Sequence, residues 1–274
     1  MKRSNKKAAS GAFSGVRLVA TRTTTAEPAA AIVTADTVSV GFRVDKERVT
    51  PDVIDQVEAA IMANREVRAI AWACNPTWET CRGLVMVHAT QKHVDDAIAT
   101  AAIVAGQAIT ECNTCGVAAH AADSAAISQW GAQLWANKGE EFPPLTPVTA
   151  TPLHAVVDGR VTASFQIDVQ HEFSREAWWE VWLSLVDGAD VTISRWARPR
   201  EDGSGVRAGG ILTVADNSAE EVALIADDLI RAVPPEVRLR VRRMRGRQII
   251  GRIASGLVGV APWVSQKKTL DCEV

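Results

Sequence analysis

The residues best suited to chemistry in this sequence are cysteines. Cys112 and Cys115 are separated by two residues, a spacing at which two thiolates can share a metal ion or form a redox-active disulfide. Cys74 and Cys81 flank a predicted turn and would complete four thiolates, but they are further apart than the tight pairs of a structural zinc site. The sequence therefore favours reduced, metal-free thiols at a helix end, with zinc or redox chemistry as the alternative.

Other catalytic patterns are absent from the sequence. Five histidines lie at positions without the mutual spacing of a catalytic set: His88, His93, His120, His154 and His171. No G-x-S-x-G elbow and no G-x-x-x-x-G-K-[ST] phosphate loop occurs. We therefore expect no catalytic residues and no cofactor. The alternative is an α/β enzyme, a transferase or hydrolase, with His171, Glu172 or the Cys112–Cys115 pair in its site.

Arginine is concentrated close to the C-terminus. Between Leu239 and Gly259 the arginines stand beside an apolar series; they are Arg240, Arg242, Arg243, Arg245, Arg247 and Arg252. This cluster suits a solvated helix face, or a surface that docks an acidic protein or anionic lipid headgroups. Nucleic-acid binding is disfavoured, because the formal net charge is -2 and no exposed aromatic residues are interleaved with the arginines.

The elements that would position these residues form two similar units. Residues 31–111 are predicted as strand, helix, strand, strand and helix, and residues 159–263 repeat that order before a final short strand and helix. Residues 112–158 are predicted as a connecting helix and a Pro-rich loop. Residues 1–30 and 264–274 are predicted as tails, the first of them basic and flexible.

Helix starts and apolar spacing support this division. Thr50 and Pro51 read as an N-cap and first helical residue, and Ser218 with Glu221 fits a capping box. The class that follows is α+β or layered α/β, in which the two pseudo-repeated units form a sheet covered by helices.

No stretch reaches the roughly 18 uncharged apolar residues that a membrane-spanning helix needs. The best candidate, Ala97–Ile109, is too short and follows two aspartates. The sequence therefore predicts a soluble or peripheral chain.

From about residue 67 to 259 the order of motifs resembles EccE, a component of the type VII (ESX) secretion system. The likeness rests on the segments Ala71–Pro76, Cys112–Cys115, Thr162–Phe165, Glu176–Leu183, Val191–Ile193, Ile211–Val214 and Arg243–Gln248, the last followed by a small-residue helix through Ile253–Ser255. Members of that family usually begin with hydrophobic membrane helices, and this sequence does not.

The resemblance implies a non-enzymatic structural subunit. It would lie peripherally at the cytoplasmic face of the cell membrane, against subunits like EccB, EccC and EccD. The residues expected to contact these partners, or anionic lipid, are Arg240, Arg242, Arg245, Arg247, Trp178 and Trp182.

Overall fold

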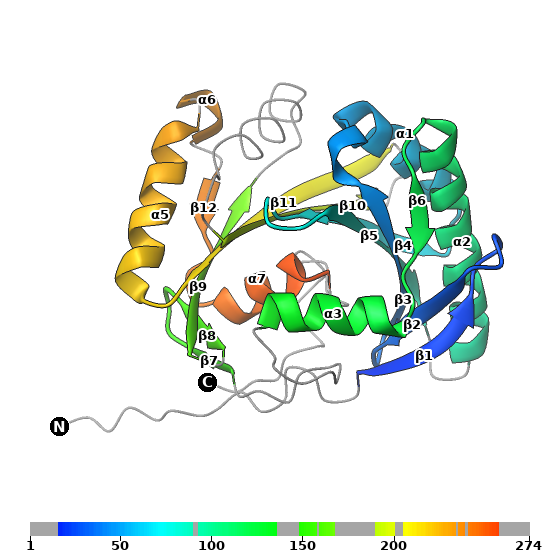
Figure 1. The fold of residues 1–274 in the computed structure, drawn as a ribbon, viewed down its shortest axis with the longest axis horizontal. Coiled ribbons are helices and arrows are strands. Elements are labelled where there is room, and N and C mark those ends of the chain that lie inside the picture. The colour runs from blue at the N-terminus through cyan, green and yellow to red at the C-terminus, as the bar shows by residue number, and fades with distance from the viewer. Residues whose placement is uncertain are drawn as a thin grey trace.

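The computed structural model describes residues 16–89, 93–135, 148–157, 159–167, 190–200, 205–233, 235–238 and 241–257. In these ranges the chain forms one antiparallel sheet of twelve strands with helices on both faces (Figure 1). The α+β class predicted from the sequence is therefore confirmed.

The strands are β1 (Arg17–Arg22), β2 (Pro28–Val33), β3 (Thr37–Asp45), β4 (Val67–Cys74), β5 (Thr80–His88), β6 (Ala119–Ala121), β7 (Val148–Ala150), β8 (Ala155–Val157), β9 (Arg160–Ile167), β10 (Asp190–Pro199), β11 (Val206–Asp216) and β12 (Val241–Arg243). The helices are η1 (Lys46–Arg48), α1 (Pro51–Met62), α2 (Val94–Thr114), α3 (Ser124–Trp135), α5 (Ala219–Ala232), α6 (Pro235–Arg238) and α7 (Gln248–Ser255).

The spatial order of the strands is β1-β2-β3-β5-β4-β10-β11-β9-β8-β7. β4 and β10 join the N-terminal and C-terminal halves of the sheet, with Ile70 paired to Ala197 and Cys74 paired to Ile193. Two short strands lie off this path, since β6 pairs with β3 and β12 pairs with β9. The sheet is thus continuous across both halves.

The sheet arches over α3 and α7, while α1, α2 and α5 cover its outer, convex side (Figure 1). Successive side chains of a strand point to opposite faces, so β4 contributes to two cores. Ile70 and Trp72 belong to the convex core, and Ala71 and Ala73 belong to the concave core. Because helices cover both faces, the central strands are almost continuously buried rather than alternating.

The two helices on the concave face pack closely against strands of the sheet at glycine residues. A methyl group at Gly41 of β3 would come within 3.0 Å of Ile127 and 3.1 Å of Trp130 on α3. A methyl group at Gly251 of α7 would come within 2.4 Å of Cβ of Ser164 on β9. Glycine therefore lets each helix pack directly on a strand.

The predicted helix caps at Thr50 and Ser218 are present. The Thr50 hydroxyl accepts a hydrogen bond from the backbone N–H of Val53, and the Ser218 hydroxyl accepts one from Glu221 at 3.1 Å. Each hydroxyl satisfies one of the free N–H groups at the start of its helix.

Replacing the Ser218 hydroxyl tests the cap of α5. We expect Ser218→Ala to lower the free energy of unfolding by about 1 kcal/mol, because an N–H in the first turn loses its acceptor. Ser218→Asp should retain most of the stability, since aspartate accepts the same bond. Urea unfolding of both variants measures the difference, and equal loss in the two would assign the effect to something other than capping.

Several predicted boundaries are wrong. Residues 17–30 of the predicted tail are part of an antiparallel hairpin, which β1 and β2 form from Arg17 to Val33. The connection of residues 112–158 holds β6, β7 and β8 besides a helix. The short strand expected near residues 237–241 is replaced by α6 and, slightly later, β12. These are edge strands and short elements, whose pairing depends on residues distant in sequence.

Among the described residues, no helix combines the length and apolar composition that a membrane crossing requires.

Candidate functional site

The basic segment forms the turn between β12 and α7. Arg242 and Arg245 are exposed, and Arg247 is half-buried just before the helix. Gly246 adopts a positive φ of 70° in this turn and donates its N–H to the Pro152 carbonyl at 2.8 Å. The exposed arginines are therefore displayed on a turn tied to the β7–β8 hairpin.

The arginines of this segment do not share one environment, which corrects the idea of a single solvated face. Arg243 is half-buried, with its guanidinium carbon 5.5 Å from the centre of the Phe165 ring. Arg252 is buried on α7, and burial lowers its pKa to about 10 despite the nearby carboxylate of Asp190. Only part of the cluster is available to a partner.

Several predicted site residues lie outside the described part of the structure. These are Arg240, Trp178, Trp182, His171 and Glu172. The predicted contact surface is therefore represented by Arg242, Arg245 and Arg247.

The four cysteines near the predicted turn and helix end fall into two separate places. Cys112 is buried at the end of α2, where burial raises its pKa to about 12, and Cys115 is half-buried at the helix C-cap. Cys74 and Cys81 are buried on β4 and β5 and share a hydrogen bond that lowers the pKa of Cys74 and raises that of Cys81. The described residues contain no group of three or more metal-ligating side chains.

This placement makes the zinc alternative directly testable. We expect elemental analysis of the purified protein to find less than about one zinc per ten chains, because no set of three or more ligands converges within the described ranges. Stoichiometric zinc, with unfolding on chelation, would contradict this expectation.

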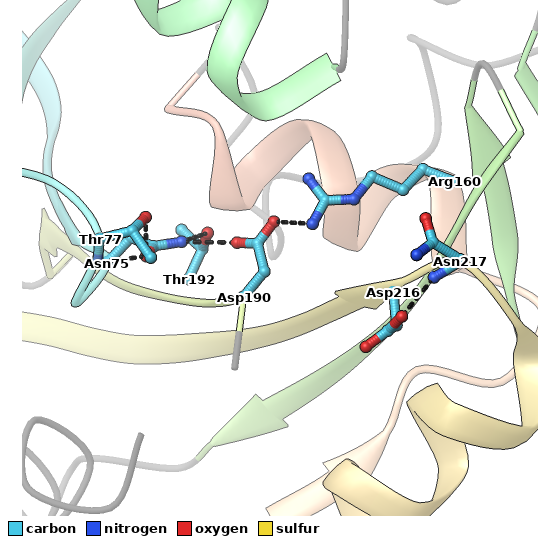
Figure 2. Close-up of polar contacts among 7 residues, drawn as sticks. All are labelled: Asn75, Thr77, Arg160, Asp190, Thr192, Asp216 and Asn217. Atoms are coloured by element: carbon cyan, nitrogen blue, oxygen red, sulfur yellow. Dashed lines mark hydrogen bonds and ion pairs between the residues drawn. The ribbon is translucent and has the colours of Figure 1, made fainter. Parts of the chain in front are cut away.

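A polar network spans the junction of the two halves (Figure 2). The Asn75 amide donates to the Asp190 carboxylate at 2.8 Å and to the Thr192 hydroxyl at 3.1 Å. Its carbonyl oxygen accepts from the backbone N–H and hydroxyl of Thr77, and Arg160 forms an ion pair with Asp190. The Asn75 amide group is thus saturated by contacts within the chain, which suits holding the β4–β5 turn against β9 and β10.

Figure 2 also shows a separate, local contact between Asp216 and Asn217. The Asp216 carboxylate accepts from the backbone N–H of Asn217 at 2.6 Å, at the end of β11. This contact lies between the end of β11 and the start of α5.

A buried ion pair links β10 to α1 across the convex face. The Arg195 guanidinium donates to both oxygens of Glu58, at 2.9 and 2.8 Å, and to Asp55 at 3.3 Å. Burial alone would lower the pKa of Arg195, but the charge of Glu58 and its hydrogen bonds raise it. Both oxygens of Glu58 are occupied by Arg195, so this ion pair stabilises the fold and does not bind a substrate.

The sequence contains a signal for this pair. Glu58 stands within the apolar stripe Ile54, Val57 and Ile61 of α1, and Arg195 stands between Ile193 and Ala197, the apolar residues on the same face of β10. A charge on an apolar face predicts a buried partner. What could not be predicted is which two charges meet, because α1 and β10 are far apart in sequence.

Comparisons with known proteins add little. No family model and no curated protein matches the sequence. Among solved structures, the chain is similar to aclacinomycin oxidoreductase, with a TM-score of 0.40 and 7% identity over 73% of this chain and 41% of the other. Two crystal forms of alkyldihydroxyacetonephosphate synthase give TM-scores of 0.32 and 0.33, at 11% and 9% identity, over 83% of this chain and 43% and 44% of theirs.

The chain thus spans less than half the length of these structures. At such TM-scores the similarity carries no argument about the fold or the activity of this chain.

Proposed function

We propose that this chain is a non-enzymatic structural subunit of a type VII secretion membrane complex, acting peripherally at the cytoplasmic face of the membrane. This function is suggested by the order of its motifs, which resembles that of EccE. The observation that carries it is the exposed turn between β12 and α7, which presents Arg242 and Arg245. Subunits like EccB, EccC and EccD, or anionic lipid beside them, are the proposed partners.

The charge environment of the turn supports a docking role. Neither Arg242 nor Arg245 forms an ion pair with another described residue, so both guanidinium groups remain available to an external acidic group. Arginine suits such contacts, because its planar fork binds carboxylate and phosphate groups through two hydrogen bonds. The turn is also tied to its neighbours through Gly246, which limits the entropy lost on docking.

Two groups of buried or half-buried charges support a structural role over catalysis. Arg195 and Glu58 neutralise one another, and Asp190 is held by Asn75 and Arg160. An active site would instead leave a titratable group free to exchange a proton with a substrate. These described charges serve the joints between strands and helices, as expected in a scaffold.

We further propose that the chain is an internal duplication. In each half a hairpin precedes the first long strand, two further long strands pair with one another, and a helix follows them. A short strand then pairs with the first long strand: β6 pairs with β3, and β12 pairs with β9. The residue that follows the short strand donates its backbone N–H to the first long strand, and the helix on the concave face comes next. These bonds join Ala122 to Gly41 at 2.9 Å and Met244 to Ser164 at 3.0 Å.

A duplicated fold suits a scaffold, because it offers two related surfaces on one rigid sheet. An experimental structure whose halves differ in the order of their elements would contradict the duplication.

Charge reversal tests the docking role. We expect Arg242→Glu combined with Arg245→Glu to release the protein from membranes of cells that make the secretion complex, and to leave the thermal midpoint within a few degrees. The physical reason is that two attractive contacts become repulsive while no internal contact is lost. Binding of the unmodified chain should also weaken with salt, because exposed charges are screened beyond about 8 Å at physiological ionic strength.

A matched control separates docking from net charge. Arg17 and Arg65 are exposed on the N-terminal half, so reversing both changes the net charge equally. That control should remain membrane-associated. Full membrane association of the Arg242/Arg245 variant would place the docking surface elsewhere, and unfolding of that variant would make these arginines structural.

A further inference from the structure

The concave face contains a buried cation with an unused hydrogen-bond donor. Arg82 of β5 is only 4% exposed, and its Nη1 has no hydrogen-bond partner in the part of the chain that the structure describes. No carboxylate among the described residues pairs with this guanidinium, and burial lowers its pKa to about 9. A buried charge without a counter-charge destabilises the folded state, so an external anion bound at Arg82 would be stabilising.

Two aromatic rings define the surroundings of this guanidinium. Its central carbon lies 3.6 Å from the centre of the Trp78 ring and 5.0 Å from the centre of the Trp130 ring. Both indoles are buried, and they come from the β4–β5 turn and from α3. Such contacts stabilise the cation through the faces of the aromatic rings. They leave the N–H groups at the edge of the guanidinium able to hydrogen-bond a planar partner.

A single exposed side chain contacts the edge of the guanidinium. Nη2 of Arg82 donates to the side-chain carbonyl oxygen of Gln133, and Gln133 is exposed on α3. A rotation of the Gln133 side chain would free Nη2 beside the already unpartnered Nη1. Two adjacent N–H donors then match the spacing of two oxygens on a carboxylate or phosphate.

A lysine fixes the turn that carries one of the two rings. The Lys46 ammonium donates to the carbonyl oxygens of Pro76 and Trp78, at 2.9 and 2.8 Å, and so fixes the turn that carries the Trp78 ring. The Trp78 ring is therefore held in place beside Arg82 by contacts within the chain.

We propose that Arg82, framed by Trp78 and Trp130, is a binding site for a small oxyanion, a carboxylate or phosphate group that displaces Gln133 and bridges Nη1 and Nη2. The Gln133 amide occupies the place of the anion in its absence. This site is on the concave side of the sheet and is independent of the proposed docking turn.

Direct titration tests the site. Isothermal titration calorimetry of the full chain with sodium formate and, separately, sodium phosphate is performed at constant ionic strength maintained with chloride. At least one of the two anions should bind the unmodified protein, and formate alone or phosphate alone would identify the preferred oxyanion. Arg82→Met should abolish the binding, because methionine fills similar space without donors.

A second variant keeps the test decisive if Arg82→Met folds poorly. Gln133→Ala removes only an exposed side chain and its competing oxygen, so it should fold and bind the same anion about three- to tenfold more tightly. Arg22→Met, at an exposed arginine of β1, should leave binding unchanged. Binding that persists in Arg82→Met, or no binding of either anion to the unmodified and Gln133→Ala proteins, would overturn the proposal.

Discussion

Glu58→Leu is expected to lower the free energy of unfolding by about 3–5 kcal/mol, because it strands the buried Arg195 guanidinium without its carboxylate. Glu58 accepts two of the three side-chain hydrogen bonds that Arg195 donates to carboxylates, and both residues are almost fully buried between α1 and β10. Urea unfolding of the variant and the unmodified chain measures the loss.

Two further variants show whether the cost arises from the stranded charge. Replacing both partners, as Arg195→Met with Glu58→Leu, should recover most of the stability, since no unpaired charge remains buried. Asp55→Asn should cost about 1 kcal/mol or less, because Asp55 is partly exposed and its bond to Arg195 is longer. A double variant as unstable as Glu58→Leu would attribute the loss to packing instead.

Trp196→Ala is expected to cost about 3–5 kcal/mol, the range for removing a large buried aromatic side chain. Trp196 is fully buried on β10 and packs in the concave core with Ile253 and Leu257. Its indole N–H also donates to the Ala254 carbonyl of α7 at 3.1 Å. The substitution therefore removes both the packing and the hydrogen bond that hold α7 under the sheet.

Trp196→Phe separates the two contributions. Phenylalanine keeps much of the apolar volume but leaves the Ala254 carbonyl without this donor, so we expect a smaller loss of about 1–3 kcal/mol. Limited proteolysis should also cut near α7 earlier in Trp196→Ala than in the unmodified chain. A loss below about 1 kcal/mol for Trp196→Ala would mean that α7 does not depend on this anchor.

The long elements of the fold were predictable because local patterns specify them. The apolar run of β3, the Thr50 and Ser218 caps and the stripe that includes Val222 and Leu229 on α5 each predict the element that is present. Strand pairing was not predictable in the same way. β6, β7, β8 and β12 have three residues each, and their positions depend on partners supplied by other parts of the chain.

The candidate sites were less predictable than the fold. Neighbouring arginines in one basic segment have opposite environments, since Arg245 is exposed and Arg252 is buried. Sequence spacing does not distinguish them, because burial depends on how α7 rotates against the sheet. Arg82 was missed for a similar reason, because the Trp130 ring beside it comes from α3 rather than from its own strand.

The central claim is that this chain works through contact with a type VII secretion complex. The most direct test is quantitative mass spectrometry of proteins that co-purify with the tagged full-length chain from gently solubilised membranes. EccB-, EccC- or EccD-like subunits should be enriched with the unmodified chain and with the Arg17/Arg65 control, and depleted with the Arg242→Glu, Arg245→Glu variant. Absence of these subunits from all three purifications would contradict the account.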